Sequence, residues 1–103
     1  MSVLFEPVTI GGLHLKNRFV RSATNDYLGR PDGAISAQQM ELYRDLATGG
    51  IGLIITGHAY VQHPLGRASV NQNAIYDKRF IEGYRRLADT LHKGFRLTHS
   101  AGR

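Results

Sequence analysis

The stretch GGIGLIITGHAYV (residues 49–61) decides the fold, because an unbroken apolar run lies between a glycine-rich start and a Gly-His pair. Residues 51–55 show no polar alternation, which is typical of a strand buried on both faces. Such strands belong to parallel sheets, since right-handed crossovers place helices over the sheet. We therefore predict an inner strand over residues 51–56, with Gly57 and His58 at its carboxyl end.

The residues before this run predict a hairpin, a short strand and a helix. VTIGGLHL (residues 8–15) turns at two glycines, which tolerate the positive φ angles of a tight hairpin. A strand follows at residues 19–20. Ser36 and Gln39 have the spacing of a capping box at a helix start. The glycine pair that opens the apolar stretch then ends this helix.

The residues after the run predict a long loop, a second helix and the start of another strand. Asp77 caps an amphipathic helix that we expect to end at Gly94, and the tail from Phe95 begins like a strand. The loops that follow strands, residues 25–35 and 62–76, are long, whereas those before strands are short. Long loops at the carboxyl ends of strands build the ligand site in α/β barrels and open α/β sheets. We therefore predict an α/β fold in which the apolar run is a barrel strand whose polar end faces a ligand.

Composition narrows the class of protein. The 103 residues form one domain at most, or a piece of one, and contain no cysteine, which excludes disulfides and thiolate chemistry. We expect no membrane span and no secretory signal, and so a cytoplasmic location. The net charge is +5, but the densest basic group, over residues 78–93, is interrupted by acidic residues. A solvated helix face explains that group better than a nucleic-acid patch does.

The individual motifs leave the chemistry open. GGIG precedes a strand, whereas a phosphate-binding glycine loop follows a strand and opens a helix, so a dinucleotide fingerprint is excluded. The five histidines lack metal-ligand spacing, and we predict no metal site and no catalytic residue. His58 and His99 fall at predicted strand ends, where each either lines a site or is a barrel-interior or loop histidine with a satisfied hydrogen bond. HPLGR (residues 63–67) is either a turn or part of a substrate loop.

An ordered series of three segments resembles the N-terminal part of the old yellow enzyme family, the FMN-dependent NADH:flavin oxidoreductases. The segments are LFEPVTIGGLHLKNRFVRSAT (residues 4–24), LYRDLATGGIGLIITGHAYV (residues 42–61) and LTHSAGR (residues 97–103). The series as a whole is more specific than any one of its members.

The resemblance implies the N-terminal portion of a TIM (β/α)8 barrel. It implies a hairpin plug over residues 4–17, a βαβα unit over 18–94 and a truncated third strand over 95–103. FMN would lie across the carboxyl ends of the strands. NADH or NADPH would reduce it, and the flavin would pass the hydride to an activated alkene or a similar small-molecule acceptor.

The same resemblance implies which residues meet the ligands. Ala23 and Thr24 take the place of a family segment that touches the flavin ring, although the alternative is that they fill the top of the barrel. Gly57 and His58 take the place of backbone contacts to the flavin. The remaining positions are Arg96, where the family has a glutamine that bonds the flavin pyrimidine, and His99, which faces substrate.

The departures from the family concern the end of the chain. The third strand is several residues shorter than in the family, and the later strands, with their substrate and phosphate contacts, have no counterpart in these residues. Fewer than three of eight strands leave two sheet edges unpaired. We expect this chain alone neither to hold FMN tightly nor to turn over. The alternative is a non-catalytic half-barrel that self-associates through its open edges or binds anions.

Overall fold

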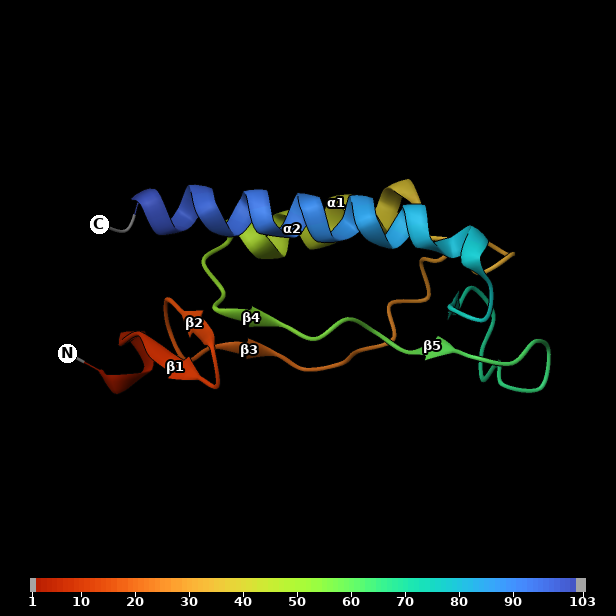
Figure 1. Ribbon diagram of the computed structural model, residues 1–103, viewed down its shortest axis with the longest axis horizontal. Helices are drawn as coiled ribbons and strands as arrows, with labels where there is room; N and C mark the ends of the chain where they lie inside the picture. The colour runs from red at the N-terminus through yellow and green to blue at the C-terminus, as the bar shows by residue number, and fades with distance from the viewer. Residues whose placement is uncertain (1, 102–103) are drawn as a thin grey trace.

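The computed structural model describes residues 2–101, and the side chains of residues 2–96. Figure 1 shows two helices lying over a row of short strands in a molecule that measures 48 × 23 × 20 Å. In chain order the elements are η1 (Val3–Phe5), β1 (Val8–Ile10), β2 (Leu13–Leu15), β3 (Val20–Arg21), α1 (Ala37–Thr48), β4 (Leu53–Ile54), β5 (Ala59–Tyr60), β6 (Asn73–Ala74), η2 (Lys78–Phe80) and α2 (Ile81–Ala101).

The predicted hairpin is confirmed. β1 and β2 pair antiparallel, and Gly11 in the turn has a φ of +59°, in the left-handed region that favours glycine. Asn17 joins the hairpin to the helix layer, because its side-chain amide donates to the Gly50 carbonyl at 2.6 Å and its Oδ1 accepts from the Phe19 N–H. The hairpin is therefore attached to the segment that enters β4.

The predicted parallel pair is also confirmed. β3 pairs parallel with β4, with Val20 opposite Leu53, and α1 lies between the two strands in sequence. The Ile55 N–H extends the ladder by donating to the Arg21 carbonyl at 3.0 Å. This is one βαβ unit, in which the crossover helix covers a face of the strand pair.

The predicted burial of residues 51–56 on both faces is wrong for this chain. Leu53 and Ile54 are half-buried, and Ile55 is 50% exposed. Both helices lie on the same side of the strands (Figure 1). The strand pair therefore has one covered face and one open face within the described part of the chain.

The start of α1 matches its sequence signal. The Ser36 side chain accepts from the Gln39 N–H, and the Gln39 side chain accepts from the Ser36 N–H, so both halves of the capping box are present. At the other end of the helix Gly50 has a φ of +100°. This left-handed residue turns the chain from α1 into β4, as the glycine pair predicted.

The predicted helix end at Gly94 and the third strand over residues 95–103 are wrong as far as residue 101, because α2 continues to Ala101. Residues 102–103 lie outside the described residues. A Cβ at Gly94 would lie 2.7 Å from the Ala47 Cβ, so this glycine allows close packing of α2 on α1. Packing against α1 offsets the helix-propensity cost of Gly94, about 1 kcal/mol, and no glycine or proline follows before Gly102.

Phe95 follows Gly94 on the same helix, and the Lys16 ammonium lies 5.7 Å from its ring centroid. Burial lowers the pKa of Lys16.

The predicted loop over residues 62–76 contains an additional short strand. β6 pairs parallel with β5, and the Ile75 N–H donates to the Tyr60 carbonyl at 2.9 Å. Tyr60 and Ala74 on these strands form a buried cluster with Phe80. Each strand has only two residues, which is too short for an alternating pattern to reveal it in the sequence.

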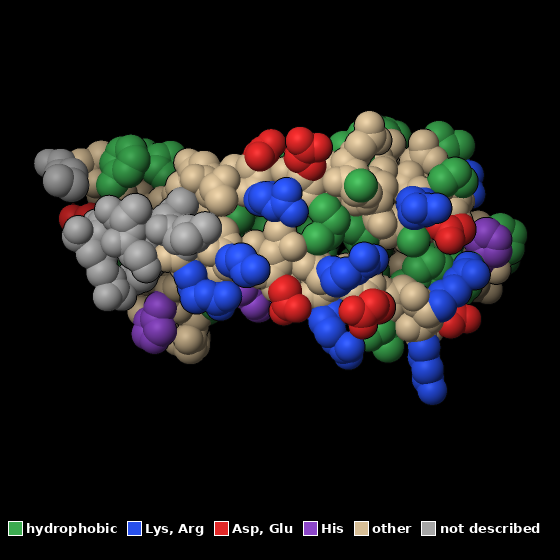
Figure 2. Space-filling model, turned by 90° about the horizontal axis from the view of Figure 1, so that it is seen from above, with side chains coloured by type: hydrophobic (Ala, Val, Ile, Leu, Met, Phe, Trp, Pro, Cys, Tyr) green, Lys and Arg blue, Asp and Glu red, His purple; other side chains and the backbone are tan. Residues whose placement is uncertain are grey.

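The helix layer presents a charged surface. Acidic and basic side chains are interspersed over it (Figure 2), and Arg85 pairs with Glu82 at 3.1 Å. Among residues 2–101 no helix combines the length and the hydrophobicity needed to cross a bilayer.

Candidate functional site

Two chain segments meet where they leave the carboxyl ends of β3 and β4. A Cβ on Gly57 would lie 2.5 Å from the Thr24 carbonyl oxygen and 3.7 Å from the Asn25 Cα. Glycine is the residue that allows two backbones to approach this closely. The structure thus brings Thr24 and Gly57 together, and their neighbours Ala23 and His58 come with them.

The surface formed by Ala23, Thr24, Gly57 and His58 is small and open. Ala23, Thr24 and His58 are exposed, and Gly57 is half-buried. The Thr24 hydroxyl donates to the Ser22 carbonyl at 3.0 Å, so this side chain is turned back onto its own strand. Small side chains and accessible backbone are what the flat ring of a flavin needs for close contact. These four residues therefore fit one part of an isoalloxazine site.

Tyr43 supports this surface from beneath. Its side chain comes from α1, is 3% exposed, and its Oη accepts the Gly57 N–H at 3.0 Å. In the sequence, Tyr43 has only the spacing of an apolar helix position, three residues after Met40 and three before Leu46. The missed signal is that a buried tyrosine hydroxyl requires a polar partner, here a backbone group at the end of the strand.

A second tyrosine, Tyr84 of α2, lies in the same layer. Its hydroxyl is buried and has no hydrogen-bond partner among the described residues. Burial and, to a lesser extent, the proximity of Tyr43 raise the pKa of Tyr84 to about 12. Tyr84 is therefore neutral at physiological pH, and its hydroxyl carries an uncompensated desolvation cost.

Gln39 anchors the loop that follows β3. Its side chain is fully buried, and its amide group donates to Asp26 at 3.0 Å and to the Asn73 Oδ1 at 2.6 Å. Its Oε1 accepts from the Asn73 side-chain amide at 3.0 Å and from the Ser36 N–H at 3.1 Å. Both donors and both lone pairs of Gln39 are satisfied. One side chain thus joins the loop over residues 25–35 to α1 and to β6.

Three further contacts hold the loops around the surface. The Asn25 side-chain amide donates to the Ser69 hydroxyl at 2.8 Å and joins the loop after β3 to the loop after β5. The HPLGR motif (residues 63–67), which could be a turn or part of a substrate loop, forms a turn. In this turn the Arg67 N–H donates to the Pro64 carbonyl at 3.2 Å. The His63 ring stacks on Tyr76 with centroids 5.3 Å apart, so this histidine has a packing role.

Arg96 and His99 do not share this location. Arg96 is exposed on α2, two residues after Gly94, which packs against Ala47 and Thr48 at the end of α1. That end of α1 leads into the amino end of β4, so Arg96 lies toward the amino end of this strand, whereas Gly57 follows its carboxyl end. His99 also lies within α2, and its side chain is outside the described residues. The predicted strand position of both residues is wrong. Within the described residues no three His, Asp or Glu side chains are placed to hold a metal ion.

The chain is similar to known flavin-dependent enzymes over most of its length. Residues 3–95 match the model of the NADH:flavin oxidoreductase / NADH oxidase family. A metal reductase of Desulforamulus reducens is 39% identical over 113 residues, covering 98% of this chain and 16% of that protein. The NADPH dehydrogenase of Bacillus subtilis is 35% identical over 106 residues, covering 97% of this chain and 31% of that protein.

A solved structure gives the same result for the fold. The crystal structure of old yellow enzyme from Pichia sp. AKU4542 matches with a TM-score of 0.82 and 27% identity, over 90% of this chain and 24% of that chain. The chain therefore corresponds to part of a TIM barrel and spans less than a third of the relatives named here. The family and these neighbours imply FMN as the cofactor and NADH or NADPH as the reductant. On its sequence match and on its fold, this chain belongs to the NADH:flavin oxidoreductase / NADH oxidase family.

Proposed function

We propose that the chain supplies β3 and β4 as the first two strands of the flavin site in an FMN-dependent oxidoreductase. The enzyme would use NADH or NADPH to reduce an activated alkene or a similar small-molecule acceptor. The observation that carries the proposal is the close approach of Gly57 to the Thr24 backbone at the carboxyl ends of two parallel strands. Ligands of α/β barrels bind at this end of the strands.

Bound FMN would supply the hydride transfer between nicotinamide and acceptor. The residues of this chain provide position. Ala23 and Thr24 would present small side chains to the ring, and Gly57 and His58 would present backbone to it. Tyr43 holds the Gly57 N–H at 3.0 Å, which fixes the end of β4 relative to α1. Such preorganisation is the protein's share of catalysis with a cofactor of this kind.

We further propose that the 103-residue chain by itself neither retains FMN nor turns over. Ala23, Thr24 and His58 are exposed, so the surface at the carboxyl ends of β3 and β4 gives a ring no enclosed pocket. Ligand sites of useful affinity enclose most of the ligand surface. The contacts supplied by β3 and β4 are one part of such an enclosure.

Titration of the isotope-labelled chain with FMN, followed by amide NMR, tests both statements. We expect fast-exchange shifts at Thr24, Gly57 and His58, no flavin absorbance after desalting, and no NADH oxidation. Shifts confined to other residues would contradict the location of the site. A yellow sample after desalting would contradict the statement that the chain alone does not retain FMN.

A second candidate function, self-association of a non-catalytic half-barrel, is favoured by the open face of the β3–β4 pair. On this face Val20 is 49% exposed and Ile55 is 50% exposed. Unpaired edges of parallel strands with exposed apolar side chains are templates for pairing with another chain. Size-exclusion chromatography at several concentrations separates the candidates. A colourless sample whose elution volume falls with concentration supports self-association, whereas a monomer with the FMN shifts described above supports the flavin-site function.

A further inference from the structure

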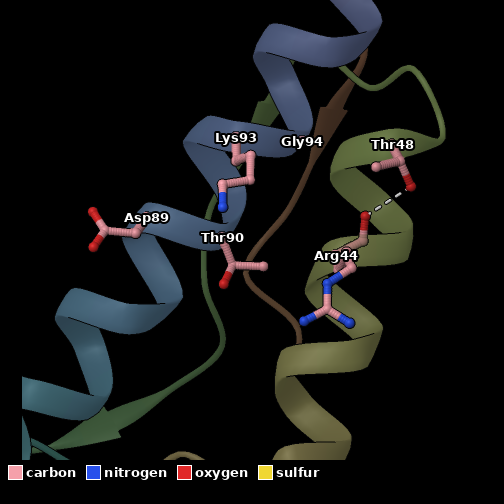
Figure 3. A pocket seen from close by; sticks show the side chains of 6 residues that line it. All are labelled: Arg44, Thr48, Asp89, Thr90, Lys93 and Gly94. Atoms are coloured by element: carbon pink, nitrogen blue, oxygen red, sulfur yellow. Dashed lines mark hydrogen bonds between the residues drawn. The ribbon is translucent and has the colours of Figure 1, made fainter.

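We propose that the groove between α1 and α2 binds a small phosphate dianion, at a site separate from the proposed flavin surface. The groove has a volume of about 210 Å³ and lies between the two helices (Figure 3). Its lining consists of Arg44, Thr48, Asp89, Thr90, Lys93 and Gly94. It belongs to the part of the helix layer that leads into the amino end of β4, whereas the flavin surface is at the carboxyl end.

The groove exists because the two helices meet at very small residues. A Cβ on Gly94 would lie 2.7 Å from Ala47 and 3.5 Å from the Thr48 methyl group. The helices are therefore close together at this point, and Gly94 contributes no side chain to fill the space beside the contact. Longer side chains on each side then form the walls.

The charged groups of the groove are predominantly basic and are not neutralised by ion pairs. Arg44 and Lys93 form no ion pair within residues 2–96, where the single ion pair joins Arg85 to Glu82. Figure 3 shows Arg44 on α1 and Lys93 on α2 at opposite sides of the groove, with Thr90 between them. The Asp89 carboxylate points away from α1 in the same view. Two cations from different helices therefore flank one concave space.

This donor set suits a doubly charged oxyanion. A guanidinium binds phosphate oxygens through two parallel N–H bonds, and an ammonium acts as a compact point charge. Thr90 is a half-buried residue that lies between them, whereas the Thr48 hydroxyl already donates to the Arg44 carbonyl at 2.9 Å. Chloride or a monocarboxylate would gain less, because a single negative charge cannot satisfy both cations fully.

Titration of the 103-residue chain with inorganic phosphate, with sodium chloride adjusted to hold the ionic strength constant, tests the site. Amide NMR shifts report where the anion binds, and thermal unfolding reports linkage, since a ligand of the folded state raises Tm. We expect saturable shifts around Arg44, Thr90 and Lys93. We expect Arg44→Gln and Lys93→Gln each to weaken binding roughly tenfold.

Arg86→Gln is the matched control, because Arg86 is an exposed cation of α2 outside the groove lining. It removes the same charge and should leave the dissociation constant within about twofold. Thr90→Val removes one donor at constant charge and should weaken binding roughly threefold. Equal weakening by all three charge variants would show diffuse attraction and overturn the site, as would a lack of saturation in the unmodified chain. No flavin is present in this experiment, so its outcome is independent of the proposed oxidoreductase function.

Discussion

At the scale of single residues, the candidate site depends on a glycine that no other residue can replace without moving a backbone. We expect Gly57→Ala to lower the free energy of unfolding by about 1–3 kcal/mol, because the new Cβ would lie 2.5 Å from the Thr24 carbonyl oxygen. Urea unfolding measures the change. Gly12→Ala is the control, since a Cβ at Gly12 meets nothing within 4 Å. Equal effects of the two substitutions would contradict the close approach at Gly57.

Tyr43→Phe removes only the hydroxyl that accepts the Gly57 N–H. We expect a loss of about 1–3 kcal/mol in unfolding free energy, because a buried amide loses its partner. Amide hydrogen exchange at Gly57 should become faster by more than the global change predicts. Unchanged exchange at Gly57 in the variant would show that this hydrogen bond does not hold the end of β4.

Tyr84 has the opposite expectation, because its buried hydroxyl has no partner among the described residues. Its pKa is raised from 10.0 to about 12 in the folded chain, because burial disfavours the ionised phenolate. Ionisation therefore favours the unfolded chain, so the free energy of unfolding is unaffected by this group below pH 10 and falls as the pH rises toward 12. Tyr84→Phe should be neutral or stabilising near pH 7. It should also lose less stability than the unmodified chain between pH 10 and 12, as measured by urea unfolding at several pH values. A steeper loss in the variant would contradict the raised pKa.

At the scale of elements, two glycines of α2 show that one residue type has different roles. A Cβ at Gly94 would lie 2.7 Å from Ala47, whereas at Gly83 the nearest atom, on Ile35, is 3.5 Å away. We expect Gly83→Ala to stabilise the chain by about 0.5–1 kcal/mol through helix propensity. Gly94→Ala should destabilise it despite the same propensity gain, because α1 and α2 must separate. Thermal unfolding of the two variants measures the difference. Shifts in Tm of the same sign would contradict the packing contact between Gly94 and Ala47.

These elements also show how far the sequence predicts the fold. The hairpin, the capping box and the parallel pair depend on residues close together in the chain or on one strong apolar run, and all three were predicted. The end of α2 was mispredicted because a glycine that caps a helix and a glycine that packs against another helix look the same in sequence. Only the distant partner, Ala47, distinguishes them.

The candidate site was predicted in part for the same reason. Thr24 and Gly57 were expected to share one end of the sheet, and the structure brings them together. The supporting side chains were missed, because Tyr43 reads as an apolar helix position and Gln39 reads as a cap. Their partners, Gly57 and Asn73, lie 14 and 34 residues away in sequence, where local patterns carry no information.

At the scale of the whole molecule, the unequal covering of the strand pair governs behaviour in solution. The helices cover one face, and Val20 and Ile55 are about half exposed. If chains associate through this open surface, Ile55→Glu should shift the elution volume toward the monomer. Its unfolding free energy should fall by no more than about 1.5 kcal/mol, because only half of the Ile55 side chain is buried. Lys78→Glu changes charge on the outer surface and serves as the control, and an equal shift in elution by that variant would contradict association through the strands.

The reciprocal amide pair of Gln39 and Asn73 has a consequence for engineering. Replacing the Gln39 amide nitrogen by oxygen, as in Gln39→Glu, would set a second carboxyl group about 3.0 Å from Asp26, and two carboxylates that close cannot both ionise. The loop after β3 would then stay docked in acid and be released as the solution becomes neutral. Exchanging one nitrogen for oxygen would thus make the contact between α1 and the loop after β3 depend on pH, beside the proposed flavin surface.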